Sequence, residues 1–91
     1  MPAPFRVIWT LRAERDLAGI RDYVATESPT AADRLANRLF QAGRRLSDFP
    51  DVGRLEGVTR VLTTVPPYLI RYRVQREGVV IVGVRHGGRR P

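Results

Sequence analysis

Residues 79–84, with the sequence Val79-Val80-Ile81-Val82-Gly83-Val84, decide the fold. A short run of apolar residues of this kind predicts a β-strand that is buried on both of its faces. The strand runs directly into Arg85-His86-Gly87-Gly88-Arg89-Arg90-Pro91, a segment that holds the only histidine of the chain. We therefore expect a buried strand that ends in a flexible, cationic tail, and we expect this tail to contact a polyanion or an acidic partner.

The composition limits what can be built around this strand. The 91 residues suffice for one small domain, which we place at residues 1–91. The absence of cysteine excludes disulfides, thiol catalysis and cysteine-ligated zinc. A single histidine argues against a histidine-based metal site. We accordingly expect neither a metal nor a cofactor.

The charge of the chain is strongly positive and is carried by one residue type. The formal net charge is +7, and each of the 16 basic residues is an arginine. Guanidinium groups suit carboxylate and phosphate contacts, but they stay protonated and cannot replace lysine as a general acid or base. The N-terminus has no signal-peptide pattern, and no apolar run approaches the roughly 20 residues of a membrane span. We expect a cytoplasmic protein without membrane contact.

Two amphipathic helices are predicted after a short N-terminal strand. Thr10 is the expected N-cap of the first helix, and Ser28-Pro29 fits the start of the second, with serine as cap and proline at the first helical position. The apolar positions recur at helical spacing: Ala13, Leu17, Ile20 and Val24 in the first helix, and Ala32, Leu35, Leu39, Ala42 and Leu46 in the second. The very short connection predicts an antiparallel helical hairpin.

Strands are predicted before and after this hairpin. Residues 5–9, 58–65 and 68–75 alternate or are rich in β-branched residues, and residues 49–53 form a turn-rich connection. Pro66-Pro67 and Arg76-Glu77-Gly78 separate the last three strands. The predicted class is α+β with the order β-α-α-β-β-β, in which the helical hairpin packs on one face of a small antiparallel sheet.

Several segments, taken in order, carry a family resemblance. The first helix contains Trp9-Thr10, Ala13-Glu14-Arg15-Asp16-Leu17 and Ile20-Arg21-Asp22-Tyr23-Val24; the second helix and its loop contain Ala31-Ala32-Asp33-Arg34-Leu35 and Phe49-Pro50-Asp51-Val52-Gly53-Arg54; the last hairpin contains Pro67-Tyr68-Leu69-Ile70-Arg71-Tyr72-Arg73-Val74 and Val84-Arg85-His86-Gly87. Over residues 6–88 the chain resembles the RelE/ParE superfamily of bacterial toxins. The resemblance implies the toxin of a type II toxin–antitoxin pair, neutralised by a cognate antitoxin.

This superfamily has two activities, and the sequence favours one of them. RelE-type members cut mRNA on the ribosome and commonly use a Tyr or His near the C-terminus with cationic residues of the sheet, whereas ParE-type members poison DNA gyrase. In this chain no tyrosine follows the last strand, and Leu69 stands where RelE-type hairpins often carry a catalytic arginine. We expect a ParE-like inhibitor of DNA gyrase that is not an enzyme, with a RelE-like, ribosome-dependent mRNA endoribonuclease as the alternative. Against the first reading, the sequence after Gly87 departs from the usual ParE-like tail.

The candidate site residues follow from this choice. The residues expected to bind the target are Arg85, His86, Arg89 and Arg90, and those expected to bind the antitoxin are Arg34, Arg38, Arg45, Arg71 and Arg73. No catalytic residue is expected for the gyrase inhibitor. If the protein is a nuclease, the candidates are His86, Arg60, Arg85 and Arg89, because His86 alone could transfer a proton near neutral pH and arginines could stabilise the phosphorane.

Alternative interpretations remain open for each set. The arginines at the C-terminus and on the second helix could simply be solvated, and His86 could only fix the turn after the last strand. Arg71 and Arg73 occupy the cationic face of their strand, where they could bind a partner or face water. Tyr68 and Tyr72 lie on the other face, where core packing is favoured over base stacking.

Overall fold

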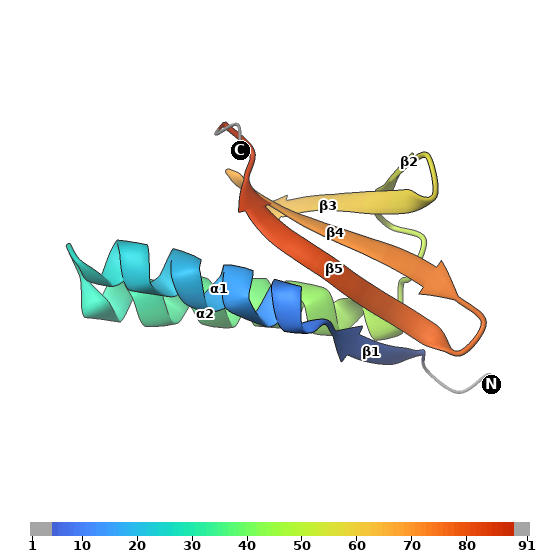
Figure 1. Cartoon of the computed structure of the whole chain (residues 1–91), viewed down its shortest axis with the longest axis horizontal. Helices are drawn as coiled ribbons and strands as arrows, with labels where there is room; N and C mark the ends of the chain where they lie inside the picture. The colour runs from blue at the N-terminus through green and yellow to red at the C-terminus, as the bar shows by residue number, and fades with distance from the viewer. Residues whose placement is uncertain (1–4, 89–91) are drawn as a thin grey trace.

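The fold consists of two helices and a five-stranded sheet (Figure 1). The computed structural model describes residues 5–88. The elements are β1 (Arg6–Trp9), α1 (Leu11–Ala25), α2 (Pro29–Arg44), a 3₁₀ turn (Arg45–Ser47), β2 (Arg54–Glu56), β3 (Thr59–Val65), β4 (Tyr68–Gln75) and β5 (Gly78–His86). Both helices lie on the same face of the sheet and side by side, so the predicted fold class is confirmed.

Both predicted helix starts are confirmed by their capping hydrogen bonds. The Thr10 hydroxyl oxygen accepts the backbone N–H of Ala13 at 3.1 Å, and the Ser28 hydroxyl oxygen accepts that of Ala31 at 3.2 Å. Each bond satisfies a backbone donor that a helix leaves without an intrahelical partner. Thr10 also joins α1 to the sheet, because its hydroxyl donates to the Ile81 carbonyl of β5 at 2.9 Å.

The sheet differs from the prediction in two respects. Its strand order is β1-β5-β4-β3-β2, and β1 runs parallel to β5, so the sheet is mixed and not purely antiparallel. The short strand β2 was expected to be part of a connection, but it pairs with the first residues of β3. Strands β3, β4 and β5 form the predicted antiparallel meander. The parallel pairing joins the two ends of the chain, and no local pattern in the sequence specifies it.

Strand β5 lies between β1 and β4, but it is not, as was predicted, buried equally on both faces. Val79, Ile81 and Val84 are buried against the helices, whereas Val80 on the other side is only half-buried. The strand also extends further than predicted, because Arg85 and His86 pair with Leu69 and Tyr68 of β4. The expected flexible tail therefore does not begin at Arg85, and the backbone N–H of Gly87 still donates to the Pro67 carbonyl at 2.7 Å.

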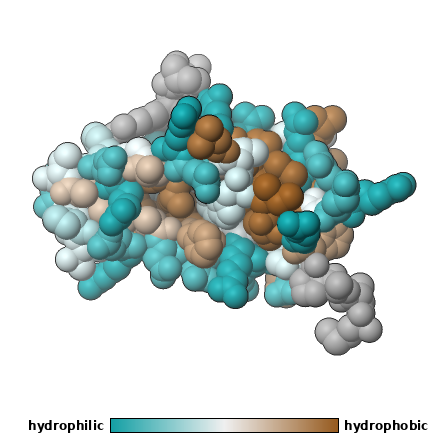
Figure 2. Space-filling view, turned by 60° about the horizontal axis from the view of Figure 1, so that its bottom comes forward, coloured by the Kyte–Doolittle hydropathy of each residue, from teal (hydrophilic) through white to brown (hydrophobic). Residues whose placement is uncertain are grey.

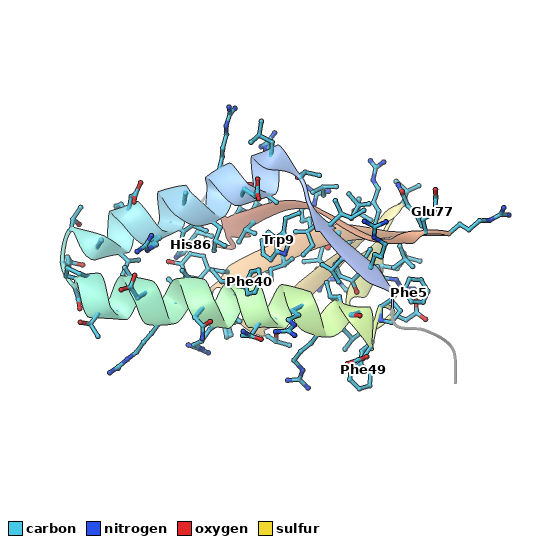
Figure 3. The ribbon with its side chains drawn as sticks, turned by 90° about the horizontal axis from the view of Figure 1, so that it is seen from below. Phe5, Trp9, Phe40, Phe49, Glu77 and His86 are labelled. Carbon is cyan, nitrogen blue, oxygen red and sulfur yellow. The ribbon has the colours of Figure 1, made fainter. Side chains whose placement is uncertain are left out.

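The core lies between the helices and the sheet. Its fully buried side chains include Leu39, Leu46, Ile70, Tyr72, Val79 and Ile81. Gly43 lets α2 approach the sheet closely: a Cβ at this position would lie 2.6 Å from Cζ2 of Trp9 and 2.8 Å from Cδ1 of Ile81. Trp9 in turn stacks on Phe40 of α2 with ring centroids 5.9 Å apart (Figure 3).

The other face of the sheet is not covered by either helix (Figure 1). We call it the open face. Strand register places on it Arg6 and Ile8 from β1, Arg54 and Glu56 from β2, Thr59 and Val61 from β3, Leu69, Arg71 and Arg73 from β4, and Val80, Gly83 and Arg85 from β5. The alternation of β4 is thus confirmed, with tyrosines toward the helices and arginines away from them.

Candidate functional site

A basic groove runs between α1 and the last part of β5. Its volume is about 740 Å³. The cationic side chains that line it are Arg12 and Arg15 from the helix and Arg71 and Arg85 from the sheet, with Asp16 as a carboxylate among them. Arg12 and Arg15 are not among the apolar positions that define the predicted face of this helix. Strand β5 brings its cationic end beside them, because β1 covers β5 only as far as Ile81.

Asp16 stabilises the wall of this groove through a hydrogen bond. Its Oδ2 accepts the backbone N–H of Val84 at 3.0 Å. This donor is available because β1 pairs with β5 only as far as Ile81, which leaves the edge of β5 beside Val84 without a strand partner. The pairing of β4 and β5 also shifts register beside Val82, between the pairs Arg71–Gly83 and Tyr72–Ile81, and bulges of this kind bend the strand. Asp16 therefore fixes the end of β5 against α1, and its charge is offset in a groove that is otherwise cationic.

His86 closes one end of the groove on the helix side of the sheet (Figure 3). Its Nδ1 accepts the backbone N–H of Gly88 at 3.1 Å, and its ring meets the Tyr68 ring edge-on with centroids 5.3 Å apart and an interplanar angle of 82°. An imidazole whose Nδ1 accepts a hydrogen bond carries its proton on Nε2 when neutral. His86 thus holds the turn that follows β5, as one of the two sequence interpretations anticipated.

The residues predicted for a nuclease are only partly brought together. Arg85 and His86 both line the basic groove, although as neighbours on a strand they point to opposite faces of the sheet. Arg60 pairs with Tyr72 and His86 pairs with Tyr68, which places them four residues apart along β4, or roughly 13 Å. The fourth candidate, Arg89, lies outside the described residues, as does the target-binding candidate Arg90.

Arg60 forms hydrogen bonds with the loop before β2. Its Nη1 donates to the carbonyl oxygens of Asp51 and Gly53 at 3.1 and 2.8 Å, and its Nη2 lies 3.6 Å from Asp51 Oδ1. The same loop is fixed from the other side by Tyr72, whose hydroxyl donates to the Pro50 carbonyl and accepts the Gly53 N–H, each at 2.8 Å. Burial raises the pKa of the Tyr72 phenol above its ordinary value.

A second, more apolar groove lies between α2 and β3. Its volume is about 530 Å³, and its lining includes Leu46, Phe49, Val52, Leu62 and Val65 together with Arg38 and Arg45. Phe49 and Val52 are 59% and 60% exposed, so this groove presents large apolar side chains to solvent. Figure 2 shows the helix side of the molecule, where hydrophobic patches lie between hydrophilic side chains. Among the described strands, β2 pairs with β3 only up to Val61, which leaves the edge of residues 62–65 free.

The residues predicted to bind an antitoxin therefore divide between two surfaces. Arg38 and Arg45 line the groove between α2 and β3, whereas Arg71 and Arg73 lie on the open face. Arg34 lies on α2 and is exposed but does not line that groove. One compact partner surface cannot include all five residues, although a segment that wraps around the edge at β2 and β3 could contact both groups.

The open face carries one carboxylate among its arginines, and the sequence did not suggest it. Glu56 Oε2 accepts a hydrogen bond from Arg54 Nη2 at 2.5 Å. The hydrogen bond from Arg54 holds the pKa of Glu56 below its ordinary value, and the charges of Arg54, Arg71 and Arg85 lower it further. Arg54 and Glu56 alternate on β2, and a sequence reading that recognised this strand would have found the pair.

Residues 5–88 contain neither a candidate metal site nor a membrane-spanning helix. Within residues 5–88, no three His, Asp or Glu side chains are grouped in a way that could hold a metal ion. None of the helices in this part of the chain is long and apolar enough to cross a membrane.

Comparison with known proteins identifies the fold as that of a small toxin. Residues 7–91 match the family model described as the ParE toxin of the type II toxin–antitoxin system parDE. Toxin RelE2 of Caulobacter vibrioides is 49% identical over 85 residues, which cover 92% of this chain and 97% of that protein. The putative toxin Y4kP of Sinorhizobium fredii is 36% identical, with 89% and 86% covered. A solved structure described as the chromosomal ParDE system from P. aeruginosa superimposes with a TM-score of 0.79 at 24% identity, over 90% of this chain and 95% of that one.

The chain belongs to the ParE toxin family of type II toxin–antitoxin systems. The family match and the similarity to toxins with RelE names confirm the resemblance inferred from the sequence.

Proposed function

We propose that this toxin acts in the cytoplasm on DNA gyrase and is neutralised by a cognate antitoxin. The observation that carries the proposal is the separation of His86 from Arg60, two of the residues that a nuclease would need. Cleavage of RNA through the 2′-OH requires proton transfer and stabilisation of the charged phosphorane at one point. His86 and Arg60 lie roughly 13 Å apart along β4, and each is held by backbone groups. The match to the ParE family model supports the same choice.

In this proposal the basic groove beside β5 contacts the target. Arg12, Arg15, Arg71 and Arg85 present guanidinium groups from two elements that are distant in sequence, and Asp16 holds the strand end in position. Arginines held on a helix and a strand keep their relative positions better than arginines on a loop. The groove therefore suits an acidic surface of a protein target.

The groove between α2 and β3 is the proposed docking site of the antitoxin. Its exposed Phe49 and Val52 offer an apolar surface, and Arg38 and Arg45 at its rim suit acidic side chains. The free edge of β3 beside it can accept a strand through backbone hydrogen bonds. A segment with apolar residues on one side and acidic residues on the other would fit this surface.

A pulse-labelling experiment tests the target. The toxin is induced without its antitoxin, and incorporation of labelled thymidine and methionine is followed over the first minutes. An early fall of DNA synthesis with intact translation is expected, together with inhibition of supercoiling by purified gyrase. An early fall of protein synthesis with intact DNA synthesis would refute the proposal.

Arg85→Ala tests the groove, and Arg76→Ala in the turn between β4 and β5 is the matched control. Both changes remove one arginine, but only Arg85 lines the groove. We expect Arg85→Ala to weaken gyrase inhibition, while Arg76→Ala retains it. Equal activity of the two variants would place the target contact elsewhere.

A RelE-like mRNA endoribonuclease is the second candidate, and the names of its relatives favour it. Three similar proteins from Caulobacter vibrioides carry the names RelE1, RelE2 and RelE3. His86 is the group to test, because it is the only histidine. If the protein is such a nuclease, His86→Ala should abolish growth inhibition and mRNA cleavage on ribosomes. A His86→Ala variant that stays fully toxic would exclude it.

A further inference from the structure

The charges of three arginines of the open face act on a single carboxylate of the chain, that of Glu56. Arg54 donates to Glu56 within β2, and Arg71 follows in the same row across the sheet, because Arg54 pairs with Val61 and Val61 pairs with Arg71. Two strand spacings separate the Arg54 and Arg71 backbones, or roughly 10 Å. Arg85 is a diagonal neighbour of Arg71 on β5, at roughly 7–8 Å. Long guanidinium side chains can meet over such distances.

The hydrogen-bond donors of Arg71 are not all satisfied by the chain. Its Nε is buried and has no hydrogen-bond partner, and its Nη2 makes only a long contact of 3.5 Å with Thr59 Oγ1. Thr59 is buried, and its hydroxyl donates to the Glu56 carbonyl at 3.0 Å, which places the Arg71 guanidinium beside the turn that carries Glu56. Nε and one Nη of arginine form the fork that binds both oxygens of a carboxylate. This fork of Arg71 has no strong acceptor among residues 5–88.

We propose that Arg54, Arg71 and Arg85 form a carboxylate-binding site, which Glu56 occupies in the free toxin and an acidic side chain of the antitoxin occupies in the complex. Glu56 is the internal competitor: it is held by one exposed ion pair with Arg54, a weak interaction that an incoming carboxylate can displace. The incoming group gains the unused donors of Arg71. This inference rests on the proposed neutralisation by an antitoxin and does not depend on the identity of the target.

The chemistry of the open face favours an acidic protein segment over a nucleic acid. Its occupant in the structure is already a carboxylate. The aromatic residues of the described strands, Trp9, Tyr68 and Tyr72, belong to the helix-covered side, so the open face has no ring on which a base could stack. The charges of all three arginines also act on one carboxylate, that of Glu56, which fits the recognition of a single acidic side chain.

The test measures binding of a fluorescein-labelled hexaglutamate peptide to the purified toxin by fluorescence anisotropy at low ionic strength. Glu56→Gln frees the arginines, and we expect it to tighten binding roughly two- to fivefold. Glu77→Gln is the matched control, because it removes the same charge in the turn between β4 and β5, at the other end of β5 from His86 (Figure 3). Equal tightening by both variants would mean that only net charge matters and would overturn the proposal.

A second pair of variants tests the site from the side of the arginines. Arg71→Gln should weaken peptide binding, whereas Arg73→Gln, two residues further on the same face of β4, should have a smaller effect. Thermal unfolding followed by circular dichroism verifies that both variants fold. If Arg71→Gln fails to fold, the Glu56→Gln comparison still decides the matter. Equal weakening by the two arginine variants would overturn the proposal.

Three further outcomes distinguish this inference from other interpretations of the site. If Glu56→Gln increases binding of a labelled hexadeoxythymidine more than binding of hexaglutamate, the site recognises phosphate and the proposal is wrong. In cells, less of the co-expressed antitoxin should co-purify with Arg71→Gln than with Arg73→Gln, which lies on the same face of β4; equal co-purification would overturn the proposal. If gyrase is unaffected by the wild-type toxin while the peptide results hold, only the assigned target fails.

Discussion

The two faces of the sheet use neighbouring residues of β4 in opposite ways. Tyr72 points toward the helices, is fully buried, and has both of its hydrogen bonds, one donated to Pro50 and one accepted from Gly53. Arg71 points to the open face, is half-buried, and has an Nε without an acceptor. The hydrogen-bonding capacity of the Tyr72 hydroxyl is therefore satisfied within the chain, whereas that of the Arg71 guanidinium is not.

This difference indicates where stability and recognition reside. Groups that are satisfied within the chain contribute to the free energy of unfolding, whereas a donor left without a partner is available to a second molecule. Substitutions on the helix-covered face should therefore affect folding first. Substitutions on the open face should affect binding first, with smaller consequences for folding.

The largest effect is expected from Leu39→Ala. Leu39 is fully buried between α2 and the sheet, and removal of its isobutyl group leaves a cavity. The free energy of unfolding should fall by about 2–5 kcal/mol. Leu69→Ala is the matched control, because Leu69 lies half-buried on the open face and should cost less. Urea unfolding measures both variants, and an equal loss would contradict the division between the faces.

Tyr72→Phe should give the next largest effect. The substitution keeps the ring but leaves the Gly53 N–H and the Pro50 carbonyl without their partner, at a cost of about 1–3 kcal/mol. Urea unfolding at pH 7 provides the measurement. The loop that also holds Arg60 should loosen, and hydrogen exchange at the Gly53 amide should become faster. Unchanged exchange would mean that Arg60 alone fixes this loop.

The same variant should change the stability at alkaline pH. Because burial raises the pKa of Tyr72 in the folded state, the neutral phenol is favoured by folding. The corresponding stability is fully present below the unfolded value of 10.0 and is lost as pH rises through the higher folded value. Urea unfolding between pH 8 and pH 11 should therefore show a steeper alkaline decline for the wild type than for Tyr72→Phe. Parallel curves would contradict this.

Local sequence patterns predicted the helices and the meander because the determining residues are close in the chain. Thr10 and Ser28 cap their helices, and the alternation of β4 separates its tyrosines from its arginines, as predicted. The parallel pairing of β1 with β5 could not be predicted, because about 70 residues separate the partners. Strand β2 was missed because it has only three residues and all of them are exposed.

The candidate sites were predictable only in part, for the same reason. The alternation placed Arg71 on a cationic face, but its neighbours Arg54 and Glu56 lie on the strand that was missed. Arg12 belongs to a helix surface that resembles any solvated face until β5 is set beside it. These sites form where segments that are distant in the sequence come together, and the residue spacing within any one segment cannot predict that contact.

Asp16→Ala should lower the stability less than the substitutions above, and it should make the basic groove more positively charged. Val84 N–H loses its acceptor, which should lower the free energy of unfolding by about 1 kcal/mol. The groove loses its carboxylate at the same time, so its arginines should attract anions more strongly. Hydrogen exchange at Val84 checks the first effect, and the salt dependence of gyrase inhibition checks the second. A variant with native exchange at Val84 would show that the ladder with β4 alone holds this end of β5.

The smallest effect on stability is expected from Glu56→Gln, which is also the substitution that should tighten peptide binding. Glu56 is exposed and its ion pair with Arg54 is screened by solvent, so the free energy of unfolding at pH 7 should change little. Because the arginines lower its pKa in the folded state, its contribution is present above the unfolded value of 4.5 and is lost as pH falls through the lower folded value. Urea unfolding between pH 7 and pH 3 should show a slightly weaker acid decline for the variant. A large loss of stability at pH 7 would mean that Glu56 is structural, and the open face would then resemble the helix-covered face more than its unpartnered Arg71 suggests.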